Sequence, residues 1–183
     1  METLSVLKDI GLRGNGDIYL GVVGPVRVGK STFIKRFMEV LIIPHIKNED
    51  DKKRALDELP QSGIGKTIMT MEPKFVPSNA VEVLVEENLT VKVRLIDCVG
   101  YIIENAQGYL EDGKMRMVKT PWFSETIPFD DAAKIGTQKV IKEHSTLGIC
   151  VLSDGTINEF TRDDYRNSED QVIEELKSID RPF

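Results

Sequence analysis

The segment that most constrains the fold is a glycine-rich stretch, residues 24–31, set between an apolar run and a helical pattern. Its sequence, Gly-Pro-Val-Arg-Val-Gly-Lys-Ser, fits the phosphate-binding loop (P-loop) pattern G-x-x-x-x-G-K-[ST]. The apolar residues 18–23 predict a strand before it, and residues 32–41 predict a helix after it. A chance match in an ordinary turn is the alternative, and average residue usage makes that rare, about one chain in a hundred.

Each position of this loop has an expected task. Gly24 and Gly29 lack a Cβ, so the backbone can curl and point successive N–H groups at an anion. Lys30 is expected to reach the β- and γ-phosphates of a nucleotide, and Ser31 to hold Mg²⁺. Arg27 could contact phosphate oxygens, or it could be a solvated side chain. The predicted nucleotide-binding set is Gly24, Pro25, Val26, Arg27, Val28, Gly29, Lys30, Ser31, Thr32 and Gly100.

The last residue of that set comes from a second motif, Asp97-Cys98-Val99-Gly100, which follows a strand pattern at residues 91–97. It fits D-x-x-G, in which the aspartate holds Mg²⁺ through water and the glycine N–H meets the γ-phosphate. The alternative is a plain turn after a strand. Between the two motifs, the loop at residues 60–77 offers two metal-binding hydroxyls, Thr67 and Thr70, and we favour Thr70. The predicted catalytic residues are Lys30, Thr70 and Asp97, and the predicted metal ligands are Ser31, Thr70 and Asp97.

The residue after the D-x-x-G glycine bears on the rate of hydrolysis. Signalling GTPases often carry a glutamine there to orient the attacking water, whereas this chain has Tyr101. We therefore expect slow hydrolysis, or hydrolysis that needs a group from another chain. No Asn-Lys-x-Asp motif for guanine occurs up to Phe183, and because that motif would lie further on, its absence leaves the base undecided.

Composition excludes several classes of protein. The 183 residues are 40% hydrophobic with a net charge of −6, which is typical of a globular domain and argues against general nucleic-acid binding. No apolar run approaches the ~18 residues of a membrane span, so we expect a cytoplasmic protein without a span. Cys98 and Cys150 lie in apolar runs, which predicts free, buried thiols in a reducing compartment.

The remaining pattern predicts a three-layer P-loop NTPase fold of the α/β class, with a mostly parallel sheet and one antiparallel hairpin strand. The chain divides into an N-terminal arm, residues 1–17, and a P-loop domain, residues 18–183. The chain stops where another strand is expected, which predicts a domain that is incomplete at its C-terminal end. In the first half of the chain we further expect a helix to about residue 44, a surface helix or subunit contact at 47–59 and a hairpin at 81–97. In the second half we expect a long loop at 98–129, a helix at 130–144 capped by Asp130, a strand at 147–152 and a helix at 168–179.

Several stretches together resemble the stage IV sporulation protein A family of endospore-forming bacteria, in its N-terminal nucleotide-binding domain. The matching stretches are residues 16–24, 29–35, 57–62, 65–70, 72–77, 97–101, 120–122, 127–129 and 143–146. The resemblance implies a domain related to the translation-factor GTPases that binds ATP and Mg²⁺ and hydrolyses ATP. It maps the family's P-loop lysine to Lys30, its metal aspartate to Asp97 and its sensor threonine to Thr70. A second threonine that the family can show is Met71 here.

The resemblance also implies a structural role. It predicts self-association into a homopolymer, which forms the basement layer of the spore coat at the outer forespore membrane, on the mother-cell side. In the full-length protein it implies contacts with a small amphipathic membrane-bound partner and with spore coat proteins. Two other functions stay open on the residues alone: a GTP-binding regulatory switch, and a module that binds nucleotide without turning it over.

Overall fold

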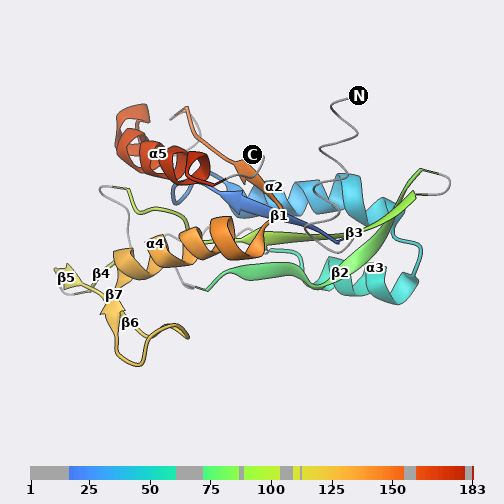
Figure 1. The fold of residues 1–183 in the computed structure, drawn as a ribbon, viewed down its shortest axis with the longest axis horizontal. Helices are drawn as coiled ribbons and strands as arrows, with labels where there is room; N and C mark the ends of the chain where they lie inside the picture. Colours follow the sequence, from blue (N-terminus) through green and yellow to red (C-terminus); the bar gives the residue numbers. More distant parts are fainter. Residues whose placement is uncertain are drawn as a thin grey trace.

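The computed structural model describes residues 17–60, 72–86, 89–103, 109–111, 113–154, 160–179 and 183. Its main sheet has four strands in the order β2-β3-β1-β8 (Figure 1). β1 is parallel to both β3 and β8, whereas β2 is antiparallel to β3. The predicted α/β fold, with a mostly parallel sheet and one antiparallel hairpin strand, is therefore confirmed. The strands are β1 (Asp17–Val23), β2 (Lys74–Glu86), β3 (Leu89–Asp97) and β8 (Leu147–Cys150).

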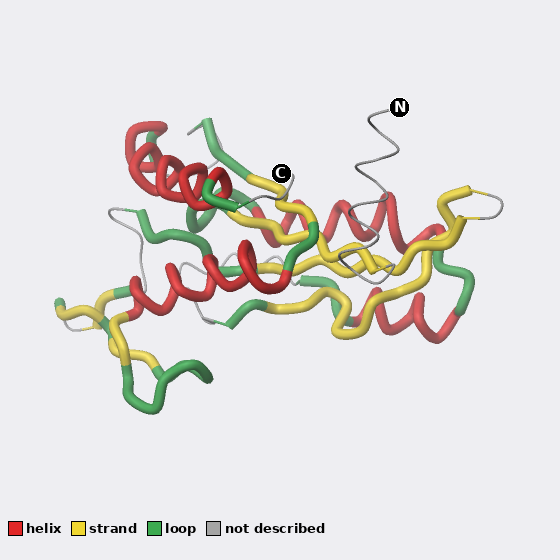
Figure 2. The backbone as a smooth tube through the Cα atoms, viewed as in Figure 1, coloured by secondary structure: helices red, strands yellow, loops and turns green. Residues whose placement is uncertain are grey.

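Helices cover both faces of this sheet, which makes three layers (Figures 1 and 2). On one face lie α2 (Lys30–Phe37), the π-helical turn η1 (Met38–Ile42), the short η2 (Ile43–His45) and α3 (Glu49–Asp57). On the other lie α4 (Phe129–Lys139), the π-helical turn η3 (Val140–His144) and α5 (Arg162–Lys177). None of the described helices is long and apolar enough to cross a lipid bilayer.

Alternation along the strands feeds the two helical layers. Leu20 and Val22 of β1 belong to the cluster under α2 and α3, whereas Val23 belongs to the cluster under α4 and α5. The period of two in a strand places successive side chains on opposite faces. β1 and β3 each have a hydrogen-bonded neighbour on both sides, so these two strands form the interior of the sheet that both helical layers cover.

Two helices begin at residues other than those predicted. Asp130 does not cap α4: the N-cap is Pro128, without a side-chain cap, and Asp130 lies in the first turn, where its charge favours the helix dipole. Full burial of Phe129 explains why the helix starts earlier. The last helix begins at Arg162, not at residue 168, because Thr161 and Asp164 form a capping box that starts a polar first turn.

Two strands also differ in extent from prediction. The hairpin strand β2 is longer than expected and begins at Lys74. A register shift between Val76 and Val81 accommodates the Pro-Ser-Asn turn signal at residues 77–79 within the strand. The strand β8 has the predicted parallel pairing, but it ends at Cys150 and not at residue 152, and its side chains are half-buried rather than fully buried.

The predicted long loop at residues 98–129 contains two small antiparallel sheets, which project beyond the N-terminal end of α4 (Figure 1). Val118 and Ile127 turn inward and pack near Phe129, whereas Leu110 and Met117 are exposed. The strands are β4 (Leu110–Glu111), β5 (Lys114–Met115), β6 (Met117–Val118) and β7 (Ile127–Pro128).

Candidate functional site

The glycine-rich loop runs from the end of β1 to the start of α2, as predicted. Gly24 has φ +150°, and a Cβ there would lie 2.1 Å from the carbonyl oxygen of Val151. Gly29 is the N-cap of α2 in the left-handed conformation, with φ 91°. Both positions therefore require glycine, one because of a close approach and the other because of its backbone angle.

The middle of the loop contributes its main chain more than its side chains. Val26 and Val28 are buried in a cluster with Ile103 and Tyr165, so their side chains point into the protein. Arg27 has φ 61°, a left-handed conformation that is uncommon for a residue with a Cβ. Such a conformation is held by the surrounding contacts, which is typical of binding loops. Of the other predicted members, Pro25 is buried and Thr32 is exposed.

Lys30 is almost fully buried, with 5% of its surface exposed. Its Nζ donates to the carbonyl oxygens of Pro25 at 2.5 Å and Gly24 at 3.3 Å. Desolvation lowers the pKa of this ammonium group, and the nearby Cys98 and Asp97 oppose that shift. Among the described residues the bonding partners of Lys30 are these carbonyl oxygens and no carboxylate, a setting that favours an anionic ligand.

Asp97 lies at the end of β3 beside the loop, because the parallel register pairs it with Val22 of β1. The Oγ of Ser31 donates to its Oδ2 at 2.6 Å. Its Oδ1 is buried and makes no hydrogen bond within the described part of the chain. Burial raises the pKa of this carboxyl group, while the Ser31 hydroxyl and the Lys30 charge act to lower it.

The D-x-x-G loop touches the glycine-rich loop directly. Gly100 has φ +90°, and a Cβ there would lie 2.1 Å from the carbonyl oxygen of Gly24 and 2.6 Å from the Nζ of Lys30. The amide of Val26 donates to the carbonyl of Tyr101 at 2.9 Å, and Pro25 and Tyr101 form a parallel β-bridge. The structure thus brings both predicted motifs into one place.

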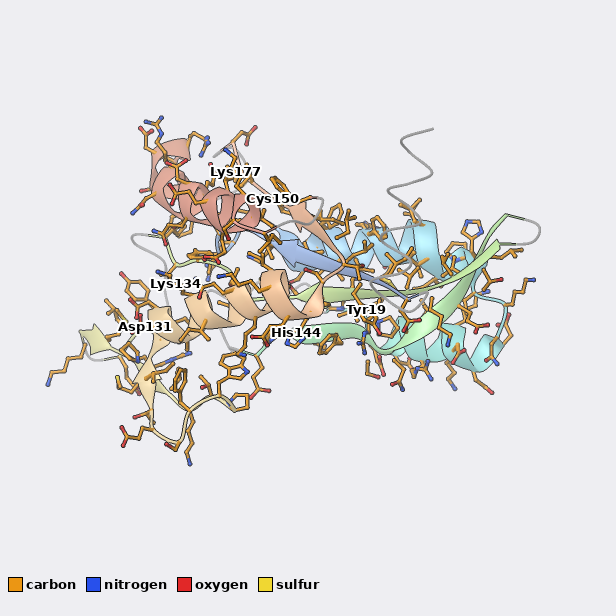
Figure 3. All side chains as sticks on the ribbon, viewed as in Figure 1. Tyr19, Asp131, Lys134, His144, Cys150 and Lys177 are labelled. Atoms are coloured by element: carbon orange, nitrogen blue, oxygen red, sulfur yellow. The ribbon has the colours of Figure 1, made fainter. Side chains whose placement is uncertain are left out.

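The side chain of Tyr101 points away from this place. It is 4% exposed and belongs to the cluster under α4 and α5. A cavity of about 340 Å³ lies there, bordered by α4, η3 and α5. Figure 3 labels Lys134 on α4, one of the residues that line it. Tyr101 therefore cannot act as the water-orienting glutamine of signalling GTPases does without leaving its packed position.

Part of the predicted site lies outside the described residues. Thr67 and Thr70 fall there, so of the predicted metal ligands the structure brings together Ser31 and Asp97. In the described ranges, no group of three or more His, Cys, Asp and Glu residues forms a metal cluster. The predicted roles of all these residues stay predictions.

Two features near the loop were missed from the sequence. Both free cysteines, Cys98 and Cys150, lie close enough to Lys30 to affect its pKa. Glu169 of α5 is 2% exposed, pairs with Arg162 and accepts from the amide of Ser153 at 3.4 Å. Glu169 thereby ties α5 to the segment after β8, which packs against Gly24. A glutamate in a helix with an exposed polar pattern gave no signal of burial.

Comparisons with known proteins show the family to which this chain is similar. The family described as stage IV sporulation protein A, ATPase domain, matches residues 1–183. The chain is 57% identical over 183 residues to stage IV sporulation protein A of Bacillus anthracis and of Bacillus subtilis (strain 168). It is 56% identical over 179 residues to that of Clostridioides difficile (strain 630).

These matches cover nearly all of this chain but only part of each relative. The two Bacillus matches cover 100% of this chain and 37% of each relative, and the Clostridioides match covers 98% and 36%. The chain thus spans a little over a third of the length of these relatives. A search of the solved structures gave no significant match. The resemblance inferred from the sequence is confirmed, and the chain belongs to the stage IV sporulation protein A family, matching its ATPase domain.

Proposed function

We propose that this domain binds ATP together with Mg²⁺ at the glycine-rich loop and hydrolyses it slowly. The observation that carries the proposal is the Ser31–Asp97 hydrogen bond beside the buried Lys30. A hydroxyl and an ammonium group from the start of α2 and a carboxylate from the end of β3 converge where two glycine-dependent loops meet. This combination supports a P-loop NTPase fold related to the translation-factor GTPases.

The residues present fit a magnesium ion. Mg²⁺ prefers hard oxygen ligands and uses few protein groups. Ser31 and Asp97 supply such oxygens, and the buried Oδ1 of Asp97 has no hydrogen bond in the described part of the chain. Ser31 would bind the ion directly and Asp97 through water, with Thr70 as the further predicted ligand. The bound metal would neutralise charge on the β- and γ-phosphates.

The chain's own residues would do the rest. Lys30 would exchange its two carbonyl partners for phosphate oxygens, which are stronger acceptors because they are charged. The N–H groups of residues 24–29 would line the phosphate chain, and that of Gly100 would meet its end. Because the Tyr101 side chain is packed elsewhere, position 101 does not supply a water-orienting group, and we expect slow turnover.

The wider role is proposed from the family. We propose that ATP turnover drives self-association of the cytoplasmic protein into the layer beneath the spore coat. One committed conformational step per subunit suits a static scaffold, and such a step needs no rapid cycling. The small amphipathic membrane-bound partner and the coat proteins would bind the longer protein.

Nucleotide binding and phosphate release test this proposal. We expect Lys30→Ala to remove most ATP binding because a buried positive charge is lost at the phosphates. Asp97→Ala and Thr70→Ala should leave binding intact or weaker and abolish phosphate release. Lys35→Ala, which removes a half-exposed cation from the same helix, is the matched control and should behave as the wild type.

Two outcomes would count against the proposal. Unchanged ATP affinity in Lys30→Ala would refute the site, and normal release in Asp97→Ala would refute the metal assignment. Competition identifies the base: displacement of bound ATP by an equal concentration of GTP would favour a regulatory GTP switch. Binding without any release in the wild type would favour a module that does not turn nucleotide over.

A further inference from the structure

Tyr101 contacts both the glycine-rich loop and the space between α4 and α5. Its main chain is bonded to the glycine-rich loop through Val26 and Pro25. Its side chain lies on the far side of the loop, in the space between α4 and α5. The preceding residue, Gly100, is the one that abuts Lys30 and the Gly24 carbonyl. A shift of the Tyr101 backbone would therefore also shift Gly100 at the phosphate end of the site.

The side chain of Tyr101 lies beside a set of polar contacts that links three helical elements. Tyr101 lines the same space as Gln138 of α4 and Glu175 of α5, and the Gln138 side chain acts to lower the pKa of the Tyr101 hydroxyl. The Nε2 of Gln138 donates to Oε2 of Glu175 on α5 at 2.8 Å, and Lys142 of η3 pairs with Oε1 of Glu175 at 2.5 Å. Both oxygens of the Glu175 carboxylate are thus engaged, by donors from α4 and from η3.

The charge states of this network are consistent with a fixed structure. Burial, together with the nearby Glu175 carboxylate, raises the pKa of Tyr101, so its hydroxyl stays protonated. Desolvation would raise the pKa of Glu175, but hydrogen bonds from Lys142 and Gln138 outweigh it and the net shift is downward. The Glu175 side chain is 14% exposed and the Lys142 side chain 49% exposed, so these contacts form a partly solvated cluster that links α4 and η3 to α5 beside the buried Tyr101 side chain.

We infer that Tyr101 is a positioning residue, which holds Gly100 against Lys30 and the glycine-rich loop by anchoring its own side chain between α4 and α5. The inference deepens the proposed function and rests on it. It assigns to Tyr101 a task opposite to that of a glutamine at this place: the side chain fixes the loop from behind and does not reach the attacking water. Gln138, Glu175 and Lys142 act through Tyr101 and support its position.

The test separates anchoring from binding by measuring ATP affinity and single-turnover phosphate release for each variant. Tyr101→Phe keeps the ring and removes the hydroxyl. We expect ATP affinity within about twofold of wild type and release slowed about threefold to tenfold, the effect of one lost hydrogen bond. Glu175→Gln, which keeps the shape but removes the charge, should slow release in the same direction with affinity unchanged. Effects that are confined to the rate indicate an interaction needed in the transition state.

A second substitution changes the rate of phosphate release in opposite directions, depending on whether Tyr101 is an anchor or only occupies the place of a catalytic side chain. Tyr101→Gln places the water-orienting residue of signalling GTPases in this chain. If Tyr101 is an anchor, release slows by more than in Tyr101→Phe, because ring packing is lost as well. If position 101 only lacks a catalytic side chain, release becomes faster. Tyr19→Phe is the matched control: it removes a tyrosine hydroxyl bonded to Asp17 at the other end of β1, and it should leave both measurements unchanged.

The remaining outcomes also decide the matter. Wild-type release in Tyr101→Phe and Glu175→Gln, or faster release in Tyr101→Gln, overturns the inference. Parallel loss of affinity and rate in Tyr101→Phe overturns it too, because that indicates uniform binding. If Tyr101→Gln does not fold, Tyr101→Phe and Glu175→Gln still decide. Lys30→Ala run beside them reports on the proposed function itself: unchanged affinity there refutes the site, whatever Tyr101 does.

Discussion

The two faces of the sheet bury comparable layers of helix but are built from different chemistry. Under α2 and α3 the core is almost wholly hydrocarbon, with Ile34, Met38 and Leu95 fully buried. Under α4 and α5 the buried set includes the Cys98 thiol and the Tyr101 phenol. The α2 face contributes mainly to the free energy of folding, since apolar packing is non-directional. The α4 face also fixes the positions of the residues it contacts, because hydrogen bonds set directions as well as distances.

The largest effect is expected where the two faces meet, at Gly100. Gly100→Ala forces a Cβ against the Gly24 carbonyl and strains a positive-φ position. We expect a loss of about 4 kcal/mol in the free energy of unfolding, combining backbone strain and overpacking, and a loss of ATP binding. Chemical denaturation and titration with ATP would measure the two. Gly113→Ala, at another positive-φ glycine with open space around its Cβ position, is the control and should leave ATP binding intact. A fully stable, ATP-binding Gly100→Ala would contradict the close contact of the two loops.

Ile34→Ala probes the hydrocarbon face alone. Ile34 is fully buried on α2, so truncation leaves a cavity and should cost about 3 kcal/mol in unfolding free energy. We expect ATP affinity of the folded protein to remain near wild type, because the side chain packs beneath the helix and away from the loop. Denaturant melts with and without ATP check both points. A loss of ATP affinity larger than the loss of stability accounts for would show that the α2 face also positions the nucleotide site.

Cys98 offers a pH test of the polar face. Burial raises the pKa of this thiol from 9.0 to about 11, so the folded chain stays protonated where the unfolded chain ionises. The unfolded state then binds fewer protons, and unfolding free energy should fall by about 2 kcal/mol as pH rises from 9 to 11. Below about pH 8 the thiol is protonated in both states, so its contribution to the unfolding free energy is constant. Melts of wild type against Cys98→Ala isolate it: the gap between the two proteins should narrow with rising pH. A constant gap would show that the thiol is not buried as described.

The smallest effect is expected on the surface of α2. Glu39 pairs with Arg36 at 2.9 Å and with Lys35 at 4.0 Å, and all three side chains contact solvent. Glu39→Gln should change the unfolding free energy by less than about 0.5 kcal/mol, because exposed ion pairs contribute little. Thermal melts at low and high salt would show it. A change above about 1 kcal/mol would mean that polar contacts also matter on the hydrocarbon face.

Much of the fold followed from patterns in the sequence that have a direct physical basis. The apolar run before Gly24 and the β-branched run before Asp97 predicted two strands, and the motifs that follow them predicted that Ser31 and Asp97 lie together. The structure has both strands and the Ser31–Asp97 hydrogen bond. Element limits were less predictable where packing outweighs local pattern. Burial of Phe129 starts α4, and a capping box with Asp164 in place of the usual glutamate starts α5. The direction of the Tyr101 side chain was not predictable, because it depends on a space that only the assembled helices create.

The strand order carries a consequence for the chemistry of sulfur in this protein. Val23 of β1 pairs with Cys150 on one side, and Cys98 follows the partner of Val22 on the other. Two strand spacings therefore separate the cysteines, roughly 10 Å between their Cα atoms, beyond the ~7 Å limit for a disulfide. Oxidation therefore cannot form a disulfide between Cys98 and Cys150 within the sheet. Cross-linking of two molecules would instead begin at Cys150, the less buried of the pair.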